Sequence, residues 1–205
     1  MSEVSTPSLS QPEAEIRAFL ARSEYAEAAT LLLRTYADEI LGYLVNALRD
    51  RELAREAFAL FARDLWQGLP KLKLQTSARA WAYALARNAS HRLLDREVRK
   101  RWREQPVSEI EAQALAIVET RPATPPYLMT ENKRQLSELR ERLSEEEQHI
   151  LTLRVDRGFD FREIAVALGT EESELETAAA RYRKRFQLIK RKLSKWLREP
   201  RGPQN

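Results

Sequence analysis

The stretch from residue 143 to residue 186 constrains the fold more than any other part of the chain. Ser144 is followed three residues later by Glu147, and Asp160 is followed at the same spacing by Glu163. Each pair has the form of a capping box, in which two side chains satisfy the free N–H groups at the start of a helix. The sequence therefore predicts that one helix begins after Ser144 and another after Asp160.

Two glycines mark where these helices end. The first helix is expected to end near Gly158 and the second at Gly169, with Thr170 capping a third helix. The apolar residues expected on the inner faces of these helices are Ile150, Leu153, Ile164, Ala165, Leu168, Leu175, Ala178, Ala179, Tyr182 and Phe186. Two helices joined by a short glycine turn are typical of a helix-turn-helix, a fold that places its last helix in the major groove of DNA.

Helical spacing of apolar residues continues through almost the whole chain. The chain of 205 residues has only five glycines, and 32% of its residues are charged. Together with the helical spacing, this composition predicts an all-α fold. No apolar run approaches the roughly 18 residues that cross a membrane, and the N-terminal residues lack the basic and apolar segments of an export signal. The chain has no cysteine, which fits a reducing compartment. The sequence therefore predicts a cytoplasmic protein that has no contact with a membrane.

The net charge of +4 is modest, but the basic residues are unevenly distributed. Residues 181–198 contain nine lysines and arginines and no acidic residue, and a second arginine-rich segment spans residues 87–103. Two separate basic segments are typical of a protein that binds a polyanion.

The chain divides into two predicted domains. We expect a disordered tail at residues 1–14, a helical domain at 15–103 and a second helical domain at 131–199. The segment 104–130 contains Pro122, Pro125 and Pro126, which are incompatible with a continuous helix, and so it is expected to be a linker. Within the first domain, Gly68 to Ser77 is expected to be a loop, with Ser77 capping the next helix.

Both predicted domains contain motifs of a known family. In the first they are Leu33-Arg-Thr-Tyr36, Trp66-Gln-Gly-Leu-Pro70, Ser77-Ala-Arg-Ala-Trp81 and Arg87-Asn88 with Asp95-Arg96. In the second they are Leu143-Ser-Glu-Glu-Glu-Gln148, Glu163-Ile-Ala165, Leu168-Gly169 and Arg181-Tyr-Arg-Lys-Arg185. With these motifs in this order, the chain resembles the extracytoplasmic-function sigma factors of bacteria, which keep only sigma regions 2 and 4.

The resemblance implies a subunit that binds core RNA polymerase, reads promoter DNA and assists strand opening. Members of this family commonly have an anti-sigma factor, which adds a further expected partner. In region 2 the resemblance places DNA contacts at Lys71, Lys73, Ser77, Arg87, Asn88, Arg92, Arg96 and Arg99. In region 4 it places them at Glu174, Glu176, Thr177, Arg181, Arg183, Lys184 and Arg185.

The resemblance also implies a polymerase-binding patch on the helix that leads to Trp66. The aligned residues are Glu56, Phe58, Ala59 and Leu60, and we expect Phe58 and Leu60 to contact polymerase through their apolar surface. Trp66 and Trp81 lie at helical spacing among leucines and alanines, and both are expected in the core.

Other functions stay open at this point. One is a sigma-like interaction protein that keeps the fold without reading promoters, and another is a helix-turn-helix regulator that binds duplex DNA. The sequence has no phosphate loop, no nucleophile motif and no cluster of metal ligands. We therefore expect no enzyme activity, metal, cofactor or small-molecule substrate.

Overall fold

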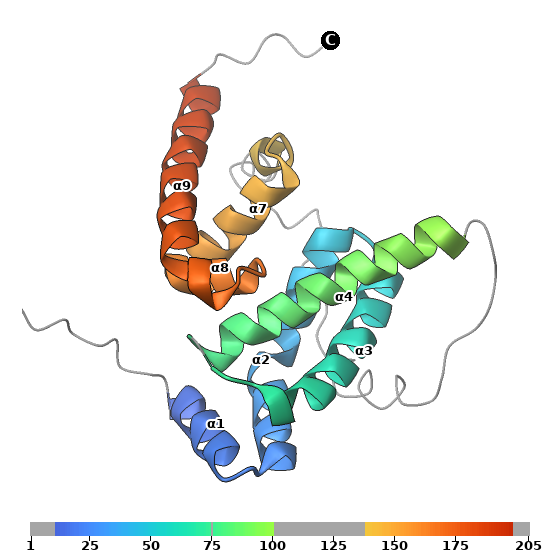
Figure 1. Ribbon diagram of the computed structural model, residues 1–205. Helices are drawn as coiled ribbons and strands as arrows, with labels where there is room; N and C mark the ends of the chain where they lie inside the picture. Colours follow the sequence, from blue (N-terminus) through green and yellow to red (C-terminus); the bar gives the residue numbers. More distant parts are fainter. Residues whose placement is uncertain (1–10, 75, 101–137, 199–205) are drawn as a thin grey trace, which may run out of the picture. The chain divides into compact units, whose positions relative to one another are not determined.

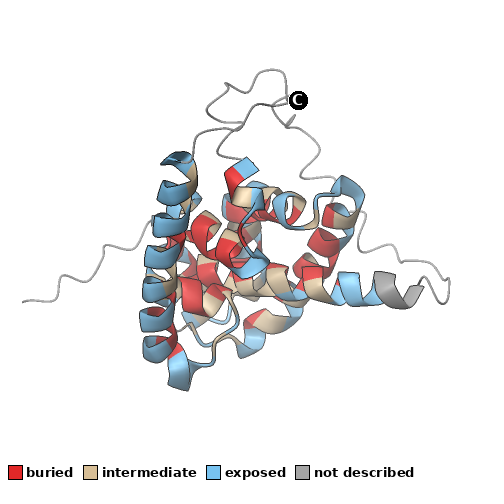
Figure 2. Cartoon of the chain, turned by 90° about the horizontal axis from the view of Figure 1, so that it is seen from above, coloured by how far each residue is buried: buried red, intermediate tan, exposed pale blue. Residues whose placement is uncertain are grey.

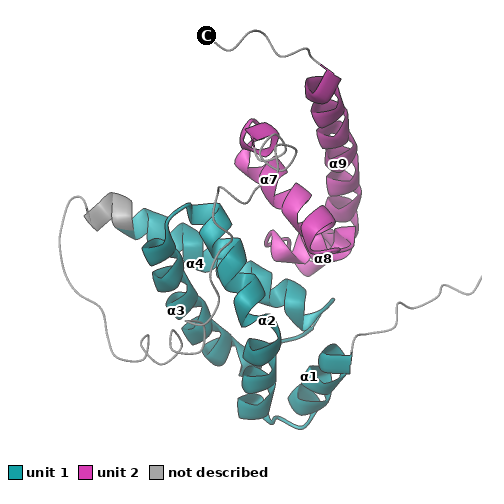
Figure 3. Ribbon diagram, turned by 180° about the vertical axis from the view of Figure 1, so that it is seen from behind, with its two compact units in different colours: residues 1–120 teal, residues 121–205 magenta. Residues whose placement is uncertain are grey.

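The computed structural model describes residues 11–74, 76–100 and 138–198, with only the backbone of 97–100. All secondary structure in these residues is helical (Figure 1). The chain forms two compact units, residues 1–120 and 121–205 (Figure 3). The predicted all-α fold with two small helical domains is thus confirmed. The boundary between the units falls within the predicted linker 104–130, which itself lies outside the described residues.

Four helices form the described part of the first unit. They are α1 (Gln11–Ala21), α2 (Tyr25–Leu48), α3 (Arg51–Gly68) and α4 (Ala78–Lys100). A single 3-10 turn, Leu69–Lys71, follows α3, where the sequence predicted only a loop. Helix α4 packs against α1, α2 and α3, and so it organises the core of this unit.

The first core is built from large side chains on α2 and α3 and a run of alanines on α4, which also contributes Tyr83 and Leu93. Ala78, Ala80, Ala82, Ala86 and Ala89 of α4 are all fully buried, which lets the neighbouring helices approach its backbone closely. The largest fully buried side chains opposite them are Leu32, Ile40, Leu44, Phe58, Phe61 and Leu65. In Figure 2 the buried residues lie on the inward sides of the helices. Each such Leu or Phe contributes about 1.5–3 kcal/mol on burial.

Helix α1 begins at Gln11, inside the tail predicted for residues 1–14. Pro12 occupies the first turn, where a missing N–H is tolerated. Glu13 is buried and Ile16 is fully buried, so tertiary contacts order residues that look like a polar tail in the sequence. The prediction of a disordered tail is therefore wrong for residues 11–14.

The second unit contains three α-helices and two short helical turns among its described elements. They are α7 (Glu145–Leu151), a π-helical turn at Thr152–Asp156, α8 (Phe161–Ala167), a 3-10 turn at Glu172–Glu174 and α9 (Leu175–Arg198). Helix α9 packs against both α7 and α8. Its inner face buries Leu175, Ala178, Ala179, Tyr182 and Ile189.

Both predicted capping boxes are present. The Glu147 N–H donates to the Ser144 hydroxyl at 3.4 Å, and the Ser144 N–H donates to the Glu147 carboxylate at 3.2 Å. The corresponding distances at Asp160 and Glu163 are 2.8 and 3.0 Å. The predicted starts of the first two helices are therefore confirmed.

The two predicted turn glycines have left-handed backbones, with φ of 72° at Gly158 and 83° at Gly169. The third helix, however, starts later than predicted. Thr170 belongs to the turn after α8, which its N–H closes by donating to the Ala165 carbonyl at 3.0 Å, and it is not the N-cap residue. A 3-10 turn with Glu171 at its N-cap position then leads into α9.

Candidate nucleic-acid interface

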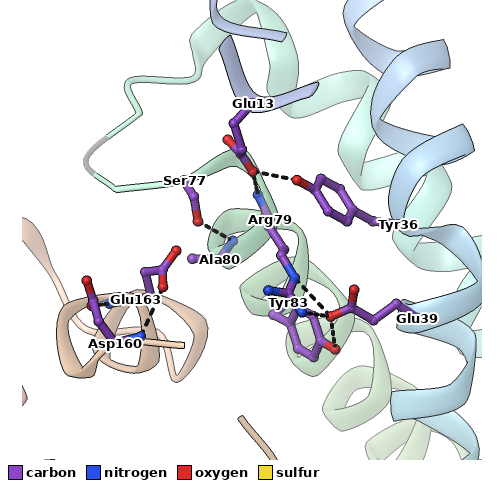
Figure 4. A network of polar contacts seen from close by, with 9 residues as sticks. All are labelled: Glu13, Tyr36, Glu39, Ser77, Arg79, Ala80, Tyr83, Asp160 and Glu163. Atoms are coloured by element: carbon purple, nitrogen blue, oxygen red, sulfur yellow. Dashed lines mark hydrogen bonds and ion pairs between the residues drawn. The ribbon is translucent and has the colours of Figure 1, made fainter. Parts of the chain in front are cut away.

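Two carboxylates, the buried Glu13 and the half-buried Glu39, fix the start of α4, which follows the loop predicted to contact DNA. Glu13 accepts hydrogen bonds from the Tyr36 hydroxyl and the Arg79 N–H (Figure 4), and a third from the Ala78 N–H, each at 2.9 Å. Glu39 accepts from the Arg79 guanidinium at 2.5 and 2.9 Å and from the Tyr83 hydroxyl at 2.8 Å. A carboxylate at a helix N-terminus also interacts favourably with the helix dipole. The start of α4 is therefore held in one position by α1 and α2.

The residues predicted to contact DNA around this loop differ in their availability. Lys71 and Lys73 are exposed. Ser77 is buried, and its hydroxyl accepts the Ala80 N–H at 3.1 Å, so it caps α4 as predicted. A buried hydroxyl engaged in a helix cap is poorly placed to bind a phosphate as well. The two lysines are thus the available cations of this segment.

The arginines of α4 form part of a cluster with α3. Asn88, Arg92 and Arg96 are exposed, and Arg87 is half-buried. The Arg92 guanidinium forms an ion pair with Asp64, which also lies 3.5 Å from Arg63. The side chain of Arg99 lies outside the described residues.

The electrostatics of this cluster favour an anionic ligand. The pKa of Arg92 is lowered, first by partial burial and then by the nearby positive charges of Arg63 and Arg96. Three guanidinium groups therefore lie near one another, and Asp64 is the acidic group that pairs with two of them. The guanidinium groups of this cluster can donate hydrogen bonds to a phosphate oxygen.

Most of the patch predicted to bind polymerase is buried in the structure. Glu56 is exposed, but Phe58, Ala59 and Leu60 are only 1%, 4% and 5% exposed. These three side chains belong to the interior of the first unit, where α3 packs against α2 and α4. The prediction that Phe58 and Leu60 present an apolar contact surface is therefore wrong.

Trp66 is exposed instead, against the prediction that it lies in the core. It is 56% exposed, whereas Trp81 is half-buried. The spacing of the apolar residues in the sequence could have predicted this exposure. Leu65 lies on the buried face of α3, and Trp66, the next residue, is rotated from it by about 100° around the helix. Trp66 is thus the large apolar side chain that α3 exposes at its surface.

In the second unit, acidic residues surround the start of α9. Glu174, Glu176 and Thr177 are exposed, as a groove-reading helix requires. Glu176 lies 3.0 Å from Arg162 of α8, which neutralises part of its charge. Carboxylates here repel phosphates, although a glutamate can accept a hydrogen bond from a cytosine amino group.

The four basic residues predicted to contact DNA on α9 are mostly engaged within the protein. Arg181 lies 5.1 Å from the centre of the Tyr182 ring, and Arg183 lies 5.5 Å from that of Phe161. The Arg185 Nε is 3.3 Å from the Glu147 carboxylate. Lys184 is exposed and takes part in none of the ion pairs found among the described residues.

Glu147 is the electrostatic centre of the second unit. Its side chain is 2% exposed and accepts two hydrogen bonds from Lys192, at 2.8 and 3.0 Å. Burial opposes its ionisation, but the hydrogen bonds from Lys192 and the Ser144 N–H, with the charge of Arg185, leave its pKa below the ordinary value. Arg185 therefore serves to hold α9 on α7, which competes with the predicted role in DNA binding.

Five exposed basic residues on the later turns of α9 were not predicted as contacts. They are Lys190, Arg191, Lys192, Lys195 and Arg198. No group of three or more potential metal ligands occurs in the part of the chain that the structure describes, and no helix in that part is long and apolar enough to span a membrane. Compared with known proteins, the chain matches no family model, and no curated protein sequence is significantly similar to it.

Proposed function

We propose that this protein is a sigma factor that directs core RNA polymerase to promoters and assists strand opening. One observation carries the proposal: a unit with an exposed tryptophan and arginine cluster shares a chain with a second unit whose α8, turn and α9 have the order of a helix-turn-helix. A polymerase subunit of this kind needs a protein-binding surface, cations near the captured strand and a duplex-binding helix.

The polymerase contact is assigned to the outer face of α3 around Trp66. Tryptophan is the residue type most enriched at the energetic centre of protein interfaces. Glu56 and Arg63 are exposed on the same helix and supply a polar surround. The strand-capturing surface is assigned to Lys71, Lys73, Arg92 and Arg96.

A second candidate function is a helix-turn-helix regulator that binds duplex DNA without polymerase. The burial of Phe58, Ala59 and Leu60 favours it, because three of the four residues implied to contact polymerase are not accessible. This candidate predicts duplex binding by the isolated protein and no association with core enzyme.

The deciding experiment mixes the full chain with core bacterial RNA polymerase and measures complex formation at micromolar concentration. The complex is then placed on a promoter from the protein's own locus and tested for unpaired thymines, which mark separated DNA strands. Trp66→Ala is expected to weaken core binding at least about tenfold, since truncating a central interface tryptophan costs about 2 kcal/mol or more. Leu94→Ala is the matched control, because Leu94 is also exposed on the first unit. Absence of any complex with the wild-type chain would eliminate the sigma assignment.

A further inference from the structure

Asp64 lies among the arginines of the first unit, between α3 and α4. It forms an ion pair with Arg92 across the two helices, and its carboxylate lies 3.5 Å from the guanidinium of Arg63 on its own helix. The side chain of Asp64 is 15% exposed, whereas those of Arg63 and Arg92 are 44% and 48% exposed. The carboxylate is therefore largely covered, while its two arginine partners reach solvent.

The stability of the fold does not account for this carboxylate. Asp64 lies towards the C-terminus of α3, and so it gains no stabilisation from the helix dipole, which favours negative charge at the N-terminus. Ion pairs with half-exposed arginines contribute little to stability, because water screens them. Phe61 and Leu65, on either side of it in the sequence, already bury this part of α3 in the core. The main effect of Asp64 is therefore on Arg92.

The hydrogen bonds of Arg92 limit how it can bind a second anion. Its Nε donates to the Asn88 carbonyl at 3.3 Å, and its Nη2 donates to Asp64. A guanidinium binds a phosphate or a carboxylate bidentately through two adjacent nitrogens, either Nε with Nη2 or Nη1 with Nη2. Both pairs include Nη2. A phosphate that binds Arg92 bidentately therefore competes with the Asp64 carboxylate for this nitrogen.

We infer that Asp64 is an internal competitor that holds Arg92 until a phosphate of a bound single strand displaces it. The inference rests on the proposed function, in which Arg92 and Arg96 contact a captured strand. In the free protein the ion pair neutralises Arg92 and so lowers its affinity for any one phosphate. A strand brings several phosphates at once, and its contacts with the neighbouring cations offset the loss of this ion pair.

This exchange of anions affects the salt dependence of binding. When Arg92 passes from Asp64 to a phosphate, the strand releases a cation, but the freed carboxylate takes one up. The release and the uptake largely cancel, so this contact adds little to the salt dependence of the wild-type protein. Without the carboxylate, the same contact is expected to add about 0.7 to the slope of log K against log salt.

The test measures binding of the full chain to a fluorescent single-stranded oligonucleotide of arbitrary sequence, by anisotropy at several salt concentrations. Asp64→Asn is expected to tighten binding about two- to fivefold, which corresponds to the strength of a half-exposed ion pair, and to steepen the salt slope by about 0.7. Asp95→Asn is the matched control. It removes the same charge from an exposed position next to Arg96, but Asp95 forms no ion pair with Arg92 in the described part of α4.

A double-mutant cycle separates displacement of Asp64 from a general change in charge. In an Arg92→Gln background, Asp64→Asn should have no more effect than Asp95→Asn has. Asp64→Ala removes the carboxylate in a second way, and circular dichroism checks that every variant is folded.

Three results would overturn the inference. They are unchanged or weaker strand binding by both Asp64 variants, equal tightening by Asp64→Asn and Asp95→Asn, and an Asp64→Asn effect that persists in the Arg92→Gln background. Absence of strand binding by the wild type and both Asp64 variants counts as the first of these. Because no polymerase is present, a failed association with core enzyme would refute the sigma assignment and leave this result unaffected.

Discussion

Glu147 combines two roles that are usually carried by separate residues. It is the third helical residue of a capping box on α7, and it is also the buried counter-ion of Lys192 and Arg185 on α9. The same carboxylate therefore starts one helix and fastens another to it. Since Lys192 and Arg185 are about half-exposed, they regain hydration when the carboxylate is lost, which limits the cost of removing it.

Replacing Glu147 with Gln is expected to destabilise the second unit by about 1–3 kcal/mol at neutral pH, because buried hydrogen bonds to charged groups are lost. The pKa of Glu147 in the folded protein lies below its ordinary value of 4.5. Its contribution is therefore complete above the unfolded-state pKa and is lost as pH falls through the folded-state pKa. The difference in unfolding free energy between the wild type and the Glu147→Gln variant should therefore become smaller as the pH falls through that range.

Amide hydrogen exchange of α7 and α9 at neutral and acidic pH measures this difference. The control is Glu145→Gln, which removes the same charge from an exposed position on the same helix and is expected to cost only a few tenths of a kcal/mol. A Glu147→Gln effect that persists unchanged at the lowest pH would contradict a role for the ionised carboxylate.

At the scale of the elements, the end of α3 packs closely against the start of α4 because residue 68 is a glycine. A Cβ added at Gly68 would lie 2.9 Å from Cζ2 of Trp81, closer than side chains pack. Gly68 has an ordinary helical backbone, with φ of −85°, so its role is to provide space for the indole. This contact positions Trp81 at the first turn of α4, next to the loop that carries Lys73.

Gly68→Ala is therefore expected to destabilise the first unit by about 1 kcal/mol. Overpacking costs about 1–3 kcal/mol, against a gain of about 0.5–1 kcal/mol from replacing glycine in a helix. In a Trp81→Phe background, which removes Cζ2, the same change should be neutral or stabilising. Urea unfolding of the four proteins in this cycle measures the interaction. Identical effects of Gly68→Ala in both backgrounds would refute the steric explanation.

At the scale of the whole molecule, each unit has its own core and its own polar network built on a buried carboxylate, Glu13 in the first unit and Glu147 in the second. Glu13 and Glu39 connect α1, α2 and α4 in the first unit, and Glu147 connects α7 and α9 in the second. Separate cores with separate polar networks are expected to respond separately to substitution.

Glu13→Gln and Glu147→Gln should consequently have additive effects, within about 0.5 kcal/mol. The first is expected to lower hydrogen-exchange protection in α1 and at the start of α4, because it weakens the cap of α4. The second should act on α7 and α9 alone. A substitution in one unit that lowers protection equally in the other would show that the two cores unfold together.

The local signals in this chain were sufficient to predict the fold class and many helix boundaries. Capping boxes at Ser144 and Asp160 and turn glycines at 158 and 169 act through neighbouring residues, so their effect can be derived from spacing alone. The basic character of α9 is equally a property of the sequence, because charge does not depend on folding at neutral pH.

The tertiary structure decided which of these residues are available to a partner. Phe58 and Leu60 are buried and Trp66 is exposed because the positions of α2 and α4 determine which face of α3 is covered. Arg185 is engaged because Glu147, distant in sequence, lies beneath it. Composition and spacing specify charge and periodicity, but exposure depends on neighbours brought together by the chain, and so the candidate interface could be assigned only after folding was known.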